Sequence, residues 1–290
     1  METQFLPHNS HLDDPGAFGK LDPNLRLLSK QPLVHEPDLL ERLPVGKPGI
    51  YSIAGGRQIG KTTLLKQWIL ILLRQGTQPE SIAFFTGELI DDHHTLVRIL
   101  TDHLDRKAGL QYLLLDEVSY IKNWDKGVKF LADAGLLENS VLVLTGSDTA
   151  FIQEARMRFP GRRGREGVVD FHLYPLTFRE VLLLKRVIDK KARALLDSEP
   201  GKASPKLLKH LFEEFDHYLI HGGFLTAIND MARDNTILQS TLATYSDWIR
   251  GDVLKRGKQE PYLREVLAAI IKRLVPCLKR HAPKNGNLRS

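Results

Sequence analysis

The feature that most constrains the fold of this chain is a glycine-rich stretch that joins an apolar segment to an amphipathic one. It reads Gly55-Gly56-Arg57-Gln58-Ile59-Gly60-Lys61-Thr62 and fits the pattern G-x-x-x-x-G-K-[ST]. Residues 50–54 before it are apolar enough for a buried strand, and residues 62–74 after it repeat apolar side chains at helical spacing. A strand, a glycine turn and a helix in this order let backbone N–H groups and the helix N-terminus surround a phosphate. The stretch therefore predicts a phosphate-binding loop, or P-loop, in an α/β fold.

The positions of this loop have separate expected roles. Lys61 is expected to reach the β- and γ-phosphates of ATP as a point charge, and the Thr62 hydroxyl is expected to ligate Mg²⁺. Gly55 and Gly60 permit the turn. The predicted ATP-binding residues are Gly55, Gly56, Arg57, Gln58, Ile59, Gly60, Lys61, Thr62 and Thr63, with Ser147 added from a later strand.

A second apolar segment, Tyr112–Leu115, ends in the two carboxylates Asp116 and Glu117. In open α/β sheets, ligands bind at the carboxyl edge of the strands, where such residues arrive. Asp116 is predicted to hold Mg²⁺ through water, and Glu117 is predicted to polarise the attacking water as a general base. Alone, the pattern also describes a solvated strand end. The P-loop upstream favours the catalytic interpretation.

A third apolar segment, Val141–Thr145, runs directly into Gly146-Ser147-Asp148. Either Thr145 or Ser147 is expected to sense the γ-phosphate. The competing interpretation makes Ser147 or Asp148 the N-cap of the following helix.

Five arginines lie within residues 156–165, immediately before the last predicted strand. An arginine at this place could neutralise charge on a transferring phosphoryl group, and Arg163 is the candidate catalytic arginine. A solvated basic loop and a nucleic-acid contact are the alternatives.

Short apolar segments alternate with helical ones up to Pro175, which predicts a parallel sheet covered on both faces. The predicted strands are 50–54, 82–86, 112–115, 141–145 and 168–173, with helices at 62–74, 96–104 and 125–134. Later segments are helical, at 178–194, 205–220, 225–233, 236–250 and 262–274. The predicted parts are a proline-rich arm (1–45) with room only for a short helix near 39–43, a P-loop core (46–176), a helical lid with the start of a C-terminal region (177–275) and a basic disordered tail (276–290).

The composition excludes several classes of protein. The chain has 290 residues, of which 42% are hydrophobic, and no apolar run long enough to cross a membrane. Its start lacks the basic and apolar segments of a secretory signal, and the lone Cys277 suits a reducing cytoplasm. From Arg250 onward, 11 Lys/Arg stand against three Asp/Glu, a local charge of +8 within an overall +6. A solvated tail and a contact with DNA both fit this basic segment.

Taken together, these motifs resemble the AAA-type ATPases of bacteria and archaea. The carriers, in chain order, are GGRQIGKTT, YLLLDEVSYIKNW, LVLTGSD, FPGRRGR, YPLTFREVL and HGGF, and they span roughly residues 49–252. The resemblance implies a five-stranded AAA core, a helical lid and, in longer relatives, a winged-helix or nuclease-like C-terminal region. It also implies that Arg163, or its neighbours Arg162 and Arg165, acts on ATP bound to another copy of the chain. One departure is Leu225, where such proteins usually carry proline after Gly-Gly-Phe.

The expected function is Mg²⁺-dependent ATP hydrolysis coupled to movement of the lid or of a partner. The alternative is an ATP-binding switch or DNA-associated module with negligible turnover. Glu117 favours hydrolysis, because a pure binding module needs no general base. A small-molecule kinase fits the arginine-rich segment and the helical lid less well. The expected partners are ATP, DNA through the basic tail and further copies of the chain, without a membrane.

Overall fold

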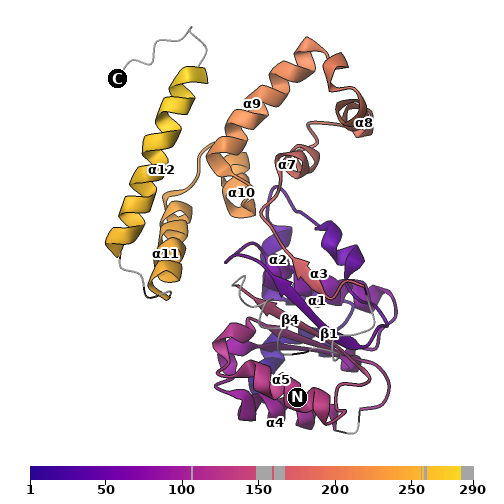
Figure 1. Ribbon diagram of the computed structural model, residues 1–290. Helices are drawn as coiled ribbons and strands as arrows, with labels where there is room; N and C mark the ends of the chain where they lie inside the picture. Colours follow the sequence, from indigo (N-terminus) through magenta and orange to yellow (C-terminus); the bar gives the residue numbers. More distant parts are fainter. Residues whose placement is uncertain (106, 148–158, 160–166, 256, 258–259, 282–290) are drawn as a thin grey trace. The chain divides into compact units, whose positions relative to one another are not determined.

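The computed structural model describes residues 1–105, 107–147, 159, 167–255, 257 and 260–281. The chain divides into two compact units, residues 1–235 and 236–290, and each is described by itself (Figure 1). Asp148, the arginines at 156–165 and the residues from 282 onward, including most of the predicted tail, lie outside the described residues.

The first unit is built on a five-stranded sheet in the order β2-β3-β4-β1-β5, with every neighbouring pair parallel. The strands are β1 (Gly49–Ala54), β2 (Ile82–Thr86), β3 (Gln111–Asp116), β4 (Ser140–Gly146) and β5 (Asp170–His172). The predicted parallel sheet is confirmed. Only β5 is much shorter than expected, although Leu173 N–H still donates to the carbonyl of Ala54 at 2.8 Å.

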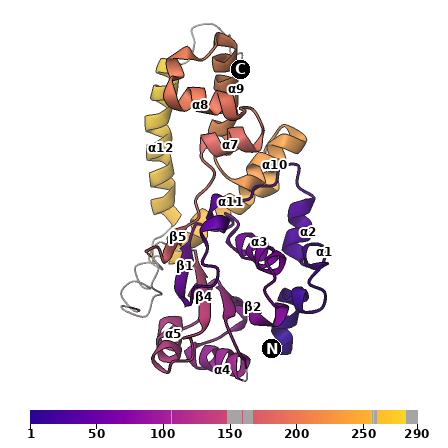
Figure 2. The same cartoon turned by 90° about the vertical axis from the view of Figure 1, so that its right-hand side faces the viewer.

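Helices cover both faces of this sheet, as the continuous apolar strands require. The helices α4 (His93–Leu104) and α5 (Trp124–Asp133) pack on the face that carries Leu113 and Leu115. The P-loop helix α3 (Lys61–Arg74) packs on the opposite face, with Tyr112 and Leu114, and the arm helices α1 (Phe18–Leu21) and α2 (Pro23–Ser29) lie beside it (Figures 1 and 2). The side chain of Asp116 belongs to the α3 face, because it follows Leu114 by two residues.

The N-terminal arm covers the edge strand β2. Its first part forms two short 3₁₀ turns, η1 (Thr3–His8) and η2 (Ser10–Leu12). Between them, the Asn9 amide donates to the carbonyl of Phe84 at 2.8 Å and accepts from its N–H at 2.7 Å, as a neighbouring strand would. The arm thereby satisfies the backbone N–H and carbonyl of Phe84, which face outward at the sheet edge.

The arm also contains two helices that the spacing of its prolines did not predict. The turn η3 (Asp38–Arg42) lies where a short helix was expected, but α1 and α2 were missed. Helix α2 begins at Pro23, the position where a helix tolerates proline best, and the Asp22 side chain caps it by accepting from Asn24 N–H at 3.0 Å.

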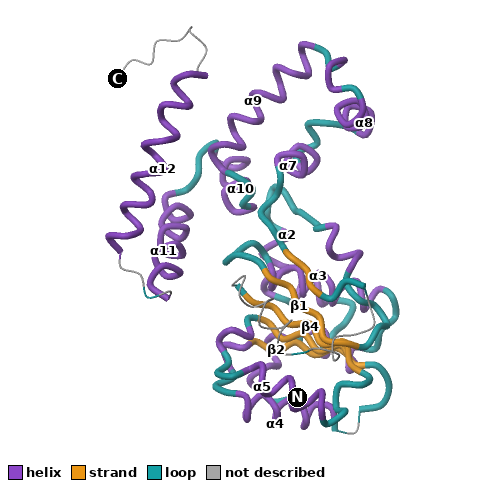
Figure 3. The backbone as a smooth tube through the Cα atoms, viewed as in Figure 1, coloured by secondary structure: helices purple, strands orange, loops and turns teal. Residues whose placement is uncertain are grey.

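The part of the first unit that follows β5 is helical, and Figure 3 shows no further strand in its described residues. It contains α7 (Phe178–Leu184), α8 (Lys190–Ser198), the turn η7 (Pro200–Lys202), α9 (Pro205–His221) and α10 (Leu225–Asp234). The single helix predicted over 178–194 was wrong. The chain leaves the helix at Arg186, whose φ is +55°, and Asp189 then caps α8 by accepting from Ala192 N–H at 2.7 Å.

The second unit consists, in its described residues, of α11 (Gln239–Lys255) and α12 (Glu260–His281). Helix α12 is longer than the predicted 262–274 and continues past residue 276, where the disordered tail was expected to begin. None of the helices in the described part of the chain combines the length and the apolar character needed to span a membrane.

Candidate active site

The predicted functional residues meet at the carboxyl edge of the sheet. Strands β1 and β4 are neighbours in the sheet. After β1 the chain continues to β2 at one end of the sheet, and after β4 it continues to β5 at the other end. A crevice opens at such a switch point. A cleft of about 1020 Å³ lies at this edge, and its lining includes Gln58, Ile59, Gly60, Lys61, Thr62, Thr63, Asp116 and Glu117.

The P-loop has the backbone conformation that its glycines allow. Gly60 has a φ of +97° and stands immediately before α3. Gly55 is required by close packing, because a Cβ at this position would lie 2.3 Å from Ile59 Cδ1 and 2.6 Å from the carbonyl oxygen of Leu173. Gln58 also takes a positive φ, of 51°, without being glycine.

Lys61 is held inside the loop. Its ammonium donates to the carbonyl oxygens of Gly55 at 3.1 Å and Gly56 at 3.0 Å, and it lies 3.0 Å from Glu117 Oε1. Only 3% of the side chain is exposed. The cation is therefore positioned among the loop residues that would surround a phosphate.

Each carboxylate oxygen of Asp116 accepts a hydrogen bond from a threonine hydroxyl. Thr62 Oγ1 donates to Asp116 Oδ2 at 2.6 Å, and Thr145 Oγ1 donates to Asp116 Oδ1. Burial raises the pKa of Asp116 above its usual value, while the hydrogen bonds from the two threonines oppose that shift.

The chemistry of these oxygen atoms fits Mg²⁺. A hydroxyl and a carboxylate oxygen 2.6 Å apart are hard ligands of the kind that Mg²⁺ takes together with water and phosphate oxygens. The described residues contain no group of three or more His, Cys, Asp or Glu side chains that could hold a metal ion. A metal ion at Thr62 and Asp116 would therefore need water or phosphate oxygens as further ligands.

Glu117 takes a left-handed backbone conformation, with φ 52° and ψ 51°. In an extended strand its side chain would point to the face opposite Asp116, whereas here Oε1 reaches Lys61. Its Oε2 is buried and has no hydrogen-bond partner among the described residues. The close packing continues at Gly87, where a Cβ would lie 2.4 Å from the Glu117 carbonyl oxygen.

The remaining predicted residues have different positions. Thr145 is fully buried behind Asp116, whereas Ser147 is half-buried. The described residues that line the cleft do not include Ser147, Gly55, Gly56 or Arg57. Arg163 and its neighbours lie outside the described residues. Sequence reasoning missed the link from Thr145 to Asp116 and the close approach at Gly87. The close approach at Gly87 had one sequence signal, the presence of a glycine directly after β2.

The far wall of the cleft comes from the arm and from α10. Asn229 in α10 accepts from Leu33 N–H at 2.8 Å and donates to the Leu33 carbonyl at 3.0 Å. The turn before α10 packs closely, because a Cβ on Gly223 would lie 2.0 Å from the Leu176 carbonyl oxygen. Leu225, at the position where the resembling proteins carry proline, lines the cleft.

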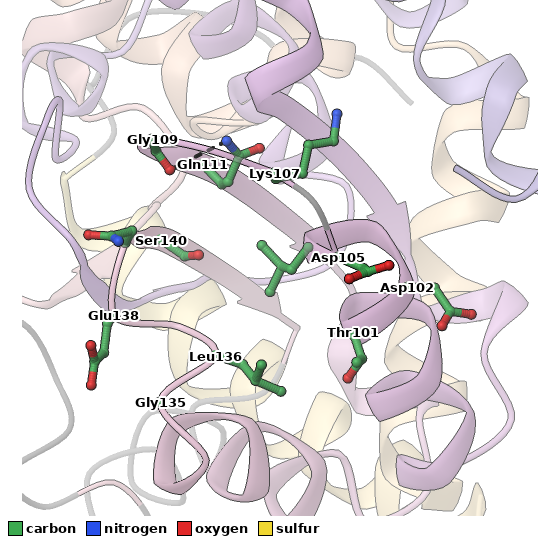
Figure 4. A pocket seen from close by; sticks show the side chains of 12 residues that line it. Thr101, Asp102, Asp105, Lys107, Gly109, Gln111, Gly135, Leu136, Glu138 and Ser140 are labelled. Atoms are coloured by element: carbon green, nitrogen blue, oxygen red, sulfur yellow. Dashed lines mark hydrogen bonds between the residues drawn. The ribbon is translucent and has the colours of Figure 1, made fainter.

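A second, smaller hollow of about 450 Å³ lies at the amino edge of β3 and β4 (Figure 4). Gln111, Leu136, Glu138 and Ser140 are among its lining residues. None of the predicted ATP-binding or catalytic residues that the structure describes is part of this lining. The candidate site is therefore the cleft at the carboxyl edge.

Comparison with known proteins agrees with this geometry. Residues 47–182 match the family described as AAA domain. An uncharacterized protein of Haemophilus influenzae is 27% identical over 185 residues, which make up 62% of this chain and 40% of that protein. An uncharacterized protein of Methanocaldococcus jannaschii is 27% identical over 280 residues, which make up 92% of this chain and 56% of that protein. The chain thus spans about half the length of these two relatives.

Two solved structures are also similar. A Walker-type ATPase of Pyrococcus abyssi shares 12% identity at a TM-score of 0.45, covering 86% of this chain and 77% of that one. The ORC1 protein of Aeropyrum pernix, solved in complex with DNA, shares 14% identity at a TM-score of 0.39, covering 85% and 66%. The segment that matches this family, residues 47–182, holds the P-loop, the paired carboxylates and all five strands, and over this segment the chain is similar to the AAA domain.

Proposed function

We propose that this chain binds ATP together with Mg²⁺ and hydrolyses it at the carboxyl edge of its sheet. The observation that carries the proposal is that the end of β3 reaches the P-loop through two contacts. Thr62 donates to Asp116 at 2.6 Å, and Lys61 lies 3.0 Å from Glu117. A phosphate in the loop would therefore lie next to both a metal-binding carboxylate and a general base.

Each residue has a defined part in this reaction. The loop N–H groups and Lys61 would bind the phosphates, and Thr62 and Asp116 would hold Mg²⁺, which when bound would supply charge neutralisation on the transferring phosphoryl group. Glu117 accepts the proton of the attacking water. The ion pair between Lys61 and Glu117 must open for this, because the γ-phosphate takes Lys61 as its partner and leaves Glu117 free to bind the water.

The proposal also assigns roles to a lid, a second copy of the chain and DNA. The helical part acts as a lid, since Leu225 and Asn229 of α10 line the cleft that would hold the nucleotide. Arg163 of a second copy would complete the site and thereby require a homo-oligomer. DNA would contact the basic segment after Arg250. Turnover measured with and without DNA tests this last contact.

The decisive experiment replaces Glu117 by Gln. The amide keeps the size of the side chain but cannot accept the proton, so turnover is expected to fall roughly 10²- to 10⁴-fold while ATP binding survives. The matched control is Glu138→Gln at the opposite edge of the sheet, which should leave turnover unchanged.

Two results would count against hydrolysis. Wild-type turnover by Glu117→Gln would remove Glu117 as the base. ATP binding by the wild type without measurable turnover, with or without DNA, would favour the alternative of a nucleotide-dependent switch or DNA-associated module.

A further inference from the structure

Thr145 is the most deeply buried polar residue next to the candidate site, with none of its surface exposed. It lies near the end of β4, where the register pairs Leu144 with Leu115 of β3. The next residues along the two strands, Thr145 and Asp116, are therefore side by side. Both point to the face that carries α3, because they follow Val143 and Leu114 by two residues.

The single hydroxyl of Thr145 makes two hydrogen bonds. It donates its hydrogen to Asp116 Oδ1, and it accepts the N–H of Glu117 at 2.9 Å. A threonine hydroxyl has only one hydrogen to give. That hydrogen is committed to Asp116, so Thr145 has none left for a γ-phosphate.

These two bonds act on different properties of the site. The first, together with the bond from Thr62, gives each oxygen of Asp116 one hydroxyl donor. The second holds the N–H of Glu117, a non-glycine residue in the left-handed conformation that L side chains rarely adopt. This conformation brings the Glu117 side chain to the Lys61 side of the sheet.

We infer that Thr145 is a positioning residue that sets the places of both acidic side chains through one hydroxyl group, and that it is not the γ-phosphate sensor. The inference rests on the proposed nucleotide site and deepens it. Of the two candidate sensors on this strand end only Ser147 is left, and it is half-buried and outside the described lining of the cleft.

The test compares Thr145→Val, which keeps the shape but removes the hydroxyl, with Thr145→Ser, which keeps the hydroxyl. The first readout is the Kd of ATP and of ADP, measured by calorimetry in EDTA and in Mg²⁺. In EDTA, we expect the nucleotide Kd of the Val variant to lie within about twofold of the wild-type value. The decrease in Kd that Mg²⁺ causes should be roughly 10- to 100-fold smaller in the Val variant than in the wild type, and kcat should fall by a similar factor. The Ser variant should recover most of both effects.

Thr101→Val, on α4 beside the second hollow, is the matched control and should behave like the wild type. Thermal melting of every variant verifies that it is folded. A merely structural role for Thr145 would lower the melting temperature and leave the Mg²⁺ dependence of the folded protein unchanged.

The outcomes separate this inference from the function on which it rests. If the wild type binds no nucleotide, the proposed function fails and the inference fails with it. If the wild type binds nucleotide more tightly with Mg²⁺ and the folded Val variant does the same, only the inference is overturned. A Val variant that loses selectivity for ATP over ADP, with normal Mg²⁺ dependence, would identify Thr145 as a γ-phosphate sensor instead.

Discussion

At the scale of single residues, the site is organised by charges that hold one another in place. Lys61 is enclosed by two loop carbonyls and by Glu117, and Asp116 by two threonine hydroxyls. Such preorganisation reduces the rearrangement that nucleotide binding demands. Under the proposed function, Lys61 would exchange the carboxylate of Glu117 for a phosphate of ATP.

Replacing Lys61 by Ala should therefore weaken ATP binding at least tenfold, about 1.4 kcal/mol, because the loop loses the cation that meets the phosphates. Calorimetric titration with ATP measures the effect. Lys129→Ala, an exposed lysine on α5, is the control and should bind ATP normally. Equal ATP affinity for Lys61→Ala and the wild type would remove the P-loop from the proposed site.

At the scale of elements, the sequence predicts the helices, strands and loops that a pattern of neighbouring residues specifies. The P-loop, β3 and its two carboxylates follow from glycine spacing and from apolar runs, and the structure brings them together. The link from Thr145 to Asp116 could not be predicted, because it depends on the register between two strands whose residues are 29 positions apart. The break between α7 and α8 was missed because no glycine or proline marks it. The positive φ falls on Arg186, and only Asp189, as an N-cap residue, gave a signal.

Helix α4 carries a titratable group into the core. Burial lowers the pKa of His103 from 6.5 to about 4, with a smaller contribution from Lys107, and its ring packs edge-on against Phe85. The folded protein keeps this histidine neutral, whereas the unfolded chain protonates it below pH 6.5. The free energy of unfolding is therefore fully retained above pH 6.5 and falls as the pH drops toward 4.

His103→Leu should remove this part of the acid sensitivity. Between pH 7.5 and pH 5, urea titration of the wild type should lose about 2 kcal/mol more of its unfolding free energy than the variant does. The comparison isolates His103, because other histidines with lowered pKa values, such as His11, contribute equally to both proteins. His210→Gln, on the exposed side of α9, serves as the control. Parallel pH profiles for His103→Leu and the wild type would contradict the assignment.

At the scale of the first unit as a whole, one buried cation joins four distant segments. The Lys66 ammonium in α3 lies 3.2 Å from Asp22 Oδ2 of the arm and donates to the carbonyl of His8. It also stands 3.7 Å above the centre of the Phe84 ring in β2. At most 1% of either charged side chain is exposed. The arm is thus fixed to the P-loop helix and to the sheet edge by a contact that water does not reach.

Asp22→Asn tests this contact, because asparagine keeps the cap on α2 but removes the negative charge. Leaving Lys66 charged and buried should cost about 3 kcal/mol of unfolding free energy at pH 7. Burial already lowers the pKa of Lys66 while Asp22 raises it, so the variant can release the lysine proton more easily than the wild type. The folded variant then binds fewer protons than its unfolded chain, so its loss of unfolding free energy relative to the wild type should shrink as the pH rises from 7 to 9.

Adding Lys66→Met to Asp22→Asn should recover most of this loss of unfolding free energy. The control Asp13→Asn, on the exposed part of the arm, should cost little unfolding free energy. A loss of unfolding free energy that is independent of pH and adds to that of Lys66→Met would mean that the two side chains contribute separately and that their ion pair does not fix the arm.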